Sequence, residues 1–226
     1  MVDCLKTKNA TDLVNNEWNA MVFGIAEFPF VPVIDGTFLV ETPEKSLRTK
    51  NFKNCSILMG SNQNEGYLYI MYYLIGLFKK EENVVVTRRD FQHAIDELNL
   101  YVSPVGKEAI FFEYTNWLTP NNPVANQEAV DRMVGDYAFT CPVGDFSYRY
   151  AETGNNAFVY YFSQRSSVNP WPTRSGVLQG DEIPFIFGEP LNSFKNYDPT
   201  EIRLSERMMA YWGNFAKTGY AWLENY

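Results

Sequence analysis

Two short apolar segments have the residue pattern of buried β-strands. The first lies in "CSILMGSNQNEG" (55–66), where an apolar run gives way to a polar turn. The second, "AFVYYFSQR" (157–165), is rich in β-branched and aromatic residues and is bounded by "GNN" and "SS". A third apolar segment, "FPFVPVIDGTFLV" (28–40), is broken by proline, so it predicts a loop and a short strand rather than a helix.

Helical spacing of apolar residues occupies much of the remaining chain. Thr87 is a candidate N-cap for the first such segment, and the last one stops before Gly219, a residue that favours a helix end. The predicted helical segments are 87–98, 106–117, 124–152 and 201–217. Strand, helices, strand and helix in this order predict an α/β fold with a parallel sheet.

Only two strands are expected in the 226 residues, which is a thin sheet for a chain of this length. We therefore expect residues 1–226 to form one partial α/β domain that lacks some of its sheet. Such a domain would expose a sheet edge and part of its core face, and we expect poor solubility from it.

Composition narrows the classes of partner. The net charge of −8 argues against nucleic acid, which requires a basic surface, and weakly favours cationic partners. The three cysteines form no CxxC pair, so no metal site is expected. Neither a dinucleotide-binding fingerprint nor a P-loop occurs, so no cofactor is expected. The apolar run "LYIMYYLIGL" (68–77) is too short to span a membrane.

The candidate chemistry lies at the ends of the two predicted strands. Glu65 follows the first strand, and Gln179 lies in the loop "GVLQGDEIPFIFGEPL" (176–191) after the second. Sites in α/β folds gather at the carboxyl ends of strands. In α/β-hydrolases the triad order is Ser, Asp or Glu, then His, so Glu65 fits the acid and Gln179 occupies the place of the histidine. The alternative is that Glu65 is a solvated turn residue.

Two absences weigh against a complete catalytic site. No GxSxG motif occurs in the chain. The only histidine, His93, lies on a predicted helix beside charged residues, and we interpret it as an exposed helix residue rather than a base. A serine hydrolase built from these residues alone would therefore lack both nucleophile and base.

Six blocks in order resemble the C-terminal part of the acetylcholinesterases, with the arthropod type the most similar, within the cholinesterase/type-B carboxylesterase family. The final "YAWLENY" (220–226) matches less well. The matching blocks are "EFPFVPVIDGTF" (27–38), "NQNEGYLYIMYY" (62–73), "FEYTNWLTPNNP" (112–123), "MVGDYAFTCPV" (133–143), "GVLQGDEIPFIFGEPL" (176–191) and "MMAYWGNFAKTG" (208–219).

This resemblance implies an α/β-hydrolase that cleaves acetylcholine or another small ester through a Ser-Glu-His triad in an aromatic gorge. Glu65 falls on the triad acid. Gln179 falls on the catalytic histidine, where the family reads "GVxHGDEI". The family's nucleophile, oxyanion glycines and choline-binding tryptophan belong to its N-terminal part, outside the blocks that match. We therefore expect these 226 residues to be catalytically inactive.

The resemblance also implies substrate-binding positions, namely Phe28, Leu68, Tyr69 and Trp171. Phe28 falls on an acyl-pocket phenylalanine and Ala26 on a second gorge position. Leu68 and Tyr69 stand where the family usually has a Tyr or Phe and a Phe. Arg174 replaces an expected tryptophan. Leu68 gives up the attraction of an aromatic ring for a quaternary ammonium, which is worth about 0.5–2 kcal/mol.

The family is secreted or held at the cell surface or synapse, and it is often homo-oligomeric. The resemblance implies that Cys4 and Cys141 pair with cysteines outside this chain and that Cys55 is a buried, unpaired core residue. Sequons at Asn9 and Asn54 agree weakly with secretion. No signal peptide opens the chain, so either the protein is cytosolic or a preceding segment is missing. A membrane association would need regions outside these residues.

Two other functions remain open. One is a non-catalytic, cholinesterase-like adhesion or binding protein, which Gln179 favours. The other is a carboxylesterase with a non-choline substrate, which Leu68 and Arg174 favour.

Overall fold

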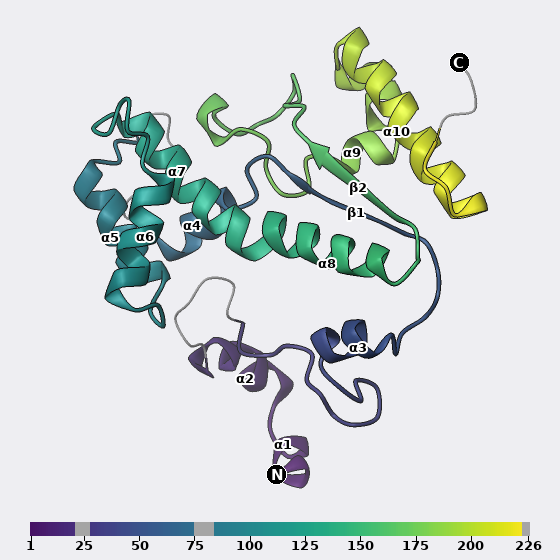
Figure 1. Ribbon diagram of the computed structural model, residues 1–226, viewed down its shortest axis with the longest axis horizontal. Coiled ribbons are helices and arrows are strands. Elements are labelled where there is room, and N and C mark those ends of the chain that lie inside the picture. The colour runs from purple at the N-terminus through teal and green to yellow at the C-terminus, as the bar shows by residue number, and fades with distance from the viewer. Residues whose placement is uncertain (21–27, 75–83, 223–226) are drawn as a thin grey trace.

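The structure, a computed structural model, describes residues 1–20, 28–74 and 84–222. Its centre is a two-stranded parallel sheet flanked by helices (Figure 1). Strand β1 (Ile57–Asn62) pairs with β2 (Ala157–Phe162) in a register that runs from Ile57 opposite Ala157 to Asn62 opposite Phe162. Both predicted strands and their parallel arrangement are confirmed.

Helices fill the long connection between the two strands. The helical segments expected within it are confirmed, and the longest is divided by a π-helical turn of five residues, Asp136–Thr140. The connection contains α4 (Tyr67–Tyr73), α5 (Arg88–Leu98), α6 (Pro104–Tyr114), α7 (Pro123–Gly135) and α8 (Cys141–Glu152). After β2 follow the short α9 (Ile183–Ile186) and the long α10 (Pro199–Thr218). In space, α8 lies on one side of the sheet, and α9 and α10 lie on the other side (Figure 1).

Local sequence signals account for the ends of α5 and α10. Thr87 caps α5 in a capping box: its hydroxyl accepts the Asp90 N–H over 3.1 Å, and the Asp90 carboxylate accepts the Thr87 N–H over 2.9 Å. Asp198 caps α10 in the same way. Gly219 ends α10 with a φ of 78°, a left-handed conformation that glycine adopts without a Cβ clash. The predicted N-cap and helix stop are therefore confirmed.

Two apolar cores flank the sheet. The larger one joins α4, α5 and α7, with Tyr67, Ile70, Phe91, Ile95, Val130 and Val134 among its fully buried side chains. The smaller one lies between β2, α9 and α10, where the ring centroids of Phe162 and Phe185 are 5.3 Å apart and Met208 packs beside them. The smaller core thus packs directly on β2, whereas the larger one lies among helices.

The two faces of β2 differ in coverage. Phe158 and Tyr160 are covered by α10, with ring centroids 5.9 Å from Phe215 and 5.0 Å from Trp212. Val159 and Tyr161 point to the other face and are 54% and 59% exposed. The expectation that part of the core face lies open is therefore confirmed for these two side chains.

The segment before β1 differs from its prediction. Residues 28–40 form a loop, as expected, but the short strand predicted there is absent from the described structure. One oxygen of Asp35 accepts hydrogen bonds from the backbone N–H groups of Thr37, Phe38 and Leu39 at 2.8–3.0 Å. These N–H groups therefore stabilise a turn and do not pair with a neighbouring strand.

Three short helices in the N-terminal region were not predicted. They are α1 (Val2–Lys6), α2 (Ala10–Asn15) and α3 (Pro43–Thr49). None of them has a buried residue, so they carry no apolar stripe that a sequence pattern could reveal.

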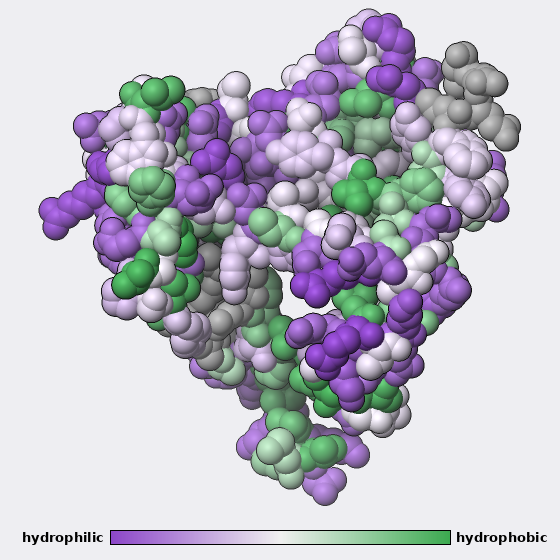
Figure 2. All heavy atoms as spheres, in the orientation of Figure 1, coloured by the Kyte–Doolittle hydropathy of each residue, from purple (hydrophilic) through white to green (hydrophobic). Residues whose placement is uncertain are grey.

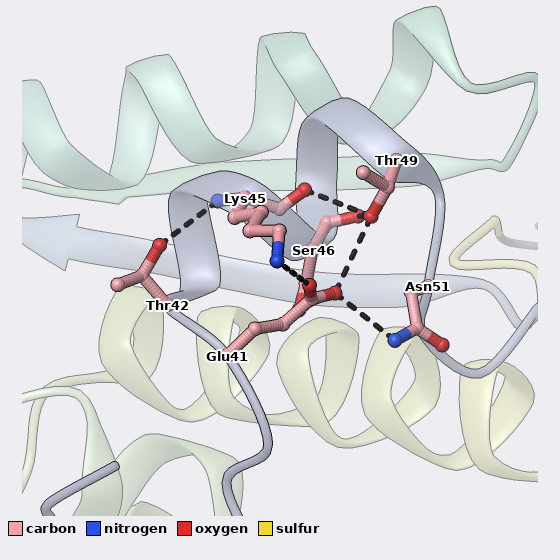
Figure 3. Close-up of polar contacts among 6 residues, drawn as sticks. All are labelled: Glu41, Thr42, Lys45, Ser46, Thr49 and Asn51. Carbon is pink, nitrogen blue, oxygen red and sulfur yellow. Dashed lines mark hydrogen bonds and ion pairs between the residues drawn. The ribbon is translucent and has the colours of Figure 1, made fainter. Parts of the chain in front are cut away.

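Polar contacts around Glu41 hold α3 together (Figure 3). The Glu41 carboxylate accepts hydrogen bonds over 3.0–3.3 Å and meets a lysine ammonium at 3.1 Å; the donors are Asn51, Ser46, Thr49 and Lys45. Asn51 and then Lys45 hold the pKa of Glu41 below its usual value. An opening separates the region of α3 from that of α8 (Figure 2), so these local contacts, rather than burial, define α3.

Candidate functional site

Asn64 joins the two loops that carry the candidate triad residues. Its backbone N–H donates to the carbonyl of Val177 over 2.9 Å, and the Val177 N–H donates back to Asn64 Oδ1 over 2.8 Å. Asn64 also forms an isolated parallel bridge with Leu178. The turn of Glu65 and the loop of Gln179 therefore lie side by side, although Asn64 and Val177 are 113 residues apart in the sequence.

Glu65 is buried, with 6% of its surface exposed, so the alternative of a solvated turn residue is wrong. Its Oε1 accepts the Asn62 N–H over 2.7 Å. Its Oε2 is buried and has no hydrogen-bond partner among the described residues. Burial raises the pKa of Glu65, and the nearby charge of Glu182 adds to the effect, while the Asn62 N–H opposes it.

Asn62, the last residue of β1, makes a second connection to the Gln179 loop. Its side-chain amide donates to the Leu178 carbonyl over 2.7 Å and to Glu182 Oε2 over 2.5 Å. Tyr160 lies beside this group on β2, where burial and then the charges of Glu182 and Glu65 raise its pKa to about 12. The carboxyl ends of both strands therefore meet one acidic cluster.

Asp131 on α7 is a buried carboxylate that the sequence reasoning missed. Its Oδ2 accepts from Asn64 Nδ2 over 2.6 Å, and its buried Oδ1 has no hydrogen-bond partner among the described residues. Burial is the largest effect and raises the pKa of Asp131 to about 7. The sequence signal that could have identified Asp131 was a charged residue within the predicted helix 124–152, at a position that faces the core.

Gln179 lies at the tip of a tight turn and is exposed. The turn is closed by the Leu178 N–H, which donates to Asp181 Oδ2 over 2.9 Å, and by the Asp181 N–H, which donates to the Leu178 carbonyl over 3.1 Å. Gly180 completes it with a φ of 88°. The turn that carries Gln179 is therefore fixed next to the turn of Glu65 through Asn64, and Gln179 itself is exposed.

Two of the predicted substrate-binding residues lie together. The rings of Phe28 and Tyr69 have centroids 6.4 Å apart, and Phe139 lies 5.3 Å from Tyr69. Leu68 is partly buried and packs against the larger core. Ala26 lies outside the described residues.

Trp171 and Arg174 lie on the segment that leads into the Gln179 loop. Trp171 is partly buried against the larger core, and its backbone N–H donates to Asn169 Oδ1 over 2.9 Å. Arg174 donates to the Tyr67 hydroxyl, and its guanidinium lies 5.8 Å from the centre of the Tyr67 ring. The charge of Arg174 is therefore engaged with a buried tyrosine of α4.

His93 is an exposed helix residue, as predicted: its side chain is 60% exposed and lies 3.1 Å from Glu97. Cys4 and Cys141 are exposed, and Cys55 is half-buried rather than buried, with its sulfur 3.6 Å from Tyr150 Oη. All three are free thiols in the structure, so the implied disulfides are not shown.

Within residues 1–20, 28–74 and 84–222, no three His, Cys, Asp or Glu side chains are arranged to hold a metal ion. No helix in these ranges is long and apolar enough to cross a membrane.

The candidate site thus combines a buried carboxylate, which follows one parallel strand, with a loop that follows the other strand. Similarity to known proteins indicates the family in which this arrangement occurs. The profile of the carboxylesterase family matches residues 1–222. The chain belongs to the carboxylesterase family. This family has the α/β-hydrolase fold, and the two-stranded parallel sheet with its helices is consistent with part of that fold.

Cholinesterases are among the similar proteins. The chain is 40% identical over 220 residues to an acetylcholinesterase of Bungarus fasciatus, and 39% identical over 224 residues to a cholinesterase of Mus musculus. It is also 38% identical over 249 residues to an acetylcholinesterase of Electrophorus electricus. Each match covers 97% of this chain but only 36–39% of the relative. The chain is therefore similar to cholinesterases over part of their length, while the arthropod type is not confirmed.

Proposed function

We propose that residues 1–226 correspond to the C-terminal part of a cholinesterase-type domain, and that they do not support ester hydrolysis because Gln179 occupies the position of the triad base. The names of the relatives supply the substrate class, which is choline esters. The observation that carries the proposal is the pair of hydrogen bonds between Asn64 and Val177, which sets the Gln179 loop beside Glu65.

Glu65 has the properties of a triad acid. Its Oε1 is held by the Asn62 N–H, and its buried Oε2 is left for a donor from outside the described contacts. In a Ser-His-acid triad the acid accepts the imidazole N–H and stabilises the imidazolium that forms when histidine takes the serine proton. We propose that Glu65 keeps this orientation although its histidine partner is absent.

A glutamine cannot replace the histidine in this role. Its amide can donate a hydrogen bond to Glu65, but it does not accept a proton near neutral pH, so no group would take the proton of an attacking hydroxyl. By analogy with subtilisin, loss of the triad base costs on the order of 10⁶ in turnover. We propose a loss of this size here.

Phe28 and Tyr69 are the proposed acyl-side wall, supported by their ring contact of 6.4 Å. Leu68 and Trp171 are proposed to line the rest of the substrate site.

A carboxylesterase of a non-choline ester is the second candidate, because Leu68 offers no ring face to a quaternary ammonium. A non-catalytic binding protein is the third, favoured by Gln179 itself. We also propose that the protein is secreted. The exposure of both sequon asparagines, Asn9 and Asn54, supports this proposal.

A chimaera tests the proposal. The part of the Bungarus fasciatus acetylcholinesterase that aligns with this chain is replaced by the chain, and acetylthiocholine hydrolysis is measured with and without Gln179→His. We expect the Gln179 chimaera to be inactive and Gln179→His to raise turnover by several orders of magnitude.

Gln63→His is the matched control, because Gln63 is exposed in the neighbouring turn and its replacement should restore nothing. Thermal unfolding of all three chimaeras shows whether they are equally folded. Equal turnover with Gln179 and with histidine at this position would contradict the proposal. Hydrolysis rates for a panel of aryl and choline esters, measured with the Gln179→His chimaera, distinguish the choline-esterase hypothesis from the hypothesis of a carboxylesterase with a non-choline substrate.

A further inference from the structure

A cavity of about 310 Å³ lies between the loop 166–170, the start of α9 and the segment 189–197. Neither Glu65 nor Gln179 lines it, so it is separate from the candidate triad. Its volume lies at the lower end of the range for small-molecule sites, which is about 300–1,000 Å³. The side chains around it include two carboxylates, one ammonium and several apolar groups.

Each of the two carboxylates has one oxygen in use. Asp181 accepts from Asn169 Nδ2 and from the Leu178 N–H, both over 2.9 Å and both on Oδ2. Glu189 accepts from the Tyr197 hydroxyl over 2.8 Å on Oε1. The hydrogen bonds of the described residues therefore leave Asp181 Oδ1 and Glu189 Oε2 as acceptors for a ligand.

The charge of the cavity is unbalanced. Lys195 is the one cation among the residues that line it, and its ammonium lies 3.8 Å from Glu189 Oε1 with its side chain 53% exposed. This loose contact is directed at Glu189. Burial, the largest effect, raises the pKa of Asp181, and the charge of Arg165, which lies outside the lining, lowers it. Among the lining residues, two carboxylates and one ammonium leave an excess of one negative charge, and a cationic ligand would favour the ionised form of Asp181.

The rest of the wall includes the polar Ser166 and Asn169 and a group of well-fixed apolar side chains. Phe185 is fully buried and packs on Phe162, with ring centroids 5.3 Å apart. Tyr197 meets Phe185 edge to face, at 6.0 Å and 83°, and its hydroxyl is tied to Glu189. Pro184 adds a rigid apolar surface at the start of α9. This wall suits a compact hydrocarbon group rather than a second charge.

We propose that this cavity binds a small primary ammonium with a compact hydrocarbon body, such as an arylalkylamine. The ammonium donates to Asp181 Oδ1 and Glu189 Oε2, and the body lies against Tyr197, Phe185 and Pro184. A primary ammonium has three N–H donors for the two available oxygens, whereas a quaternary ammonium has none. The inference is independent of the proposed loss of esterase activity, because it uses neither Glu65 nor Gln179.

Binding would reach the Gln179 loop through Asp181. The same carboxylate that faces the cavity accepts the Leu178 N–H, one residue before Gln179. A ligand on Asp181 Oδ1 therefore changes the surroundings of the 178–181 turn, which gives a local readout in an amide NMR spectrum.

The test is a titration of the full chain with 2-phenylethylamine, followed by calorimetry and by amide NMR. The neutral 2-phenylethanol and the quaternary 2-phenylethyltrimethylammonium are the matched probes. We expect saturable binding of the primary amine, with amide shifts confined to residues 166–170 and 178–197, and at least about tenfold weaker binding of the other two. Equal binding of all three probes, or no saturable binding of the primary amine, would overturn the proposal.

Variants locate the site. Glu189→Gln keeps an acceptor for the Tyr197 hydroxyl but removes the charge, and we expect it to weaken binding of the amine about tenfold. Val168→Trp fills the cavity from a residue that is 38% exposed, and we expect it to abolish binding. Glu206→Gln, on an exposed position of α10 away from the cavity, is the control and should bind like the unmodified chain. Unchanged affinity in both Glu189→Gln and Val168→Trp would overturn the assignment.

Discussion

Asn64 and Val177 exchange two hydrogen bonds, one from the backbone N–H of Asn64 and one to its side-chain oxygen, over 2.9 and 2.8 Å. The amide nitrogen of the same side chain donates to Asp131 on α7 over 2.6 Å. One asparagine therefore fixes three parts of the chain: the turn of Glu65, the loop of Gln179 and the helix behind both.

Replacing Asn64 with alanine should destabilise the fold substantially. Asn64→Ala removes the bond to Asp131 and leaves the Val177 N–H without its acceptor, in a region shielded from water. We expect a loss of about 2–4 kcal/mol in the free energy of unfolding, measured by urea titration. Gln63→Ala, at the exposed neighbouring residue, should change it by less than about 0.5 kcal/mol. Similar losses in both variants would show that the turn is not held by the Asn64 side chain.

Gly66 allows the turn of Glu65 to approach α7, and alanine at this position should prevent folding. A Cβ on Gly66 would overlap the carbonyl oxygen of Asp131 and lie 2.8 Å from the Gly135 nitrogen, both of them backbone atoms. Gly144→Ala is the matched control, because a Cβ there meets nothing within 4 Å on an exposed face of α8. We expect Gly144→Ala to stabilise α8 by about 0.5–1 kcal/mol. Circular dichroism should therefore show no cooperative melt for Gly66→Ala and a raised melting temperature for Gly144→Ala.

Asp131 should make the protein less stable as the pH rises toward neutrality. Its pKa is about 7 in the folded chain and starts from 3.8, so the folded state holds more protons between these values. The stability that this proton provides is fully present below about pH 4 and is lost as the pH rises through about 7. Urea unfolding at pH 5 and pH 8 should show the difference, on the order of a few kcal/mol.

Asp131→Asn should reduce that pH dependence, since an amide does not titrate. Glu65, whose pKa is also raised by burial, should keep a smaller slope of the same sign. A pH dependence of the unmodified chain that rises between pH 5 and pH 8, or one that Asp131→Asn leaves unchanged, would contradict the assignment to Asp131.

Histidine at position 179 should report on Glu65 directly. The chain has one native histidine, the exposed His93, so Gln179→His adds a single new pair of ring signals to the NMR spectrum. We expect the new ring to titrate above the usual value of about 6.5, because an ionised carboxylate favours the imidazolium. Adding Glu65→Gln should return the pKa to about that value. If Glu65→Gln leaves the pKa of the introduced imidazole unchanged, the two positions do not interact.

Most of the helical and strand content could be predicted from local patterns. Thr87 and Gly219 marked helix ends that the structure confirms, and the β-branched run at 157–165 contains β2. The strand expected within 28–40 failed because Asp35 draws three backbone N–H groups into a turn, which an apolar run does not reveal. Helix α3 escaped prediction because side-chain contacts to Glu41 define it rather than a buried stripe.

The sequence by itself determined the family, the order of the two strands with helices α5 to α8 and α10, and the identity of the residue at position 179, because each of these follows from residues that are close together in the chain. Tertiary structure alone decided that Glu65 is buried, that Asn64 links its turn to Val177, and that Asp131 lies behind them. Those relationships join residues 67–113 positions apart, and only the parallel pairing of β1 with β2 brings their loops to one edge of the sheet. The cavity at Asp181 and Glu189 is likewise a product of packing, since its walls come from a loop, a short helix and a turn that share no sequence pattern.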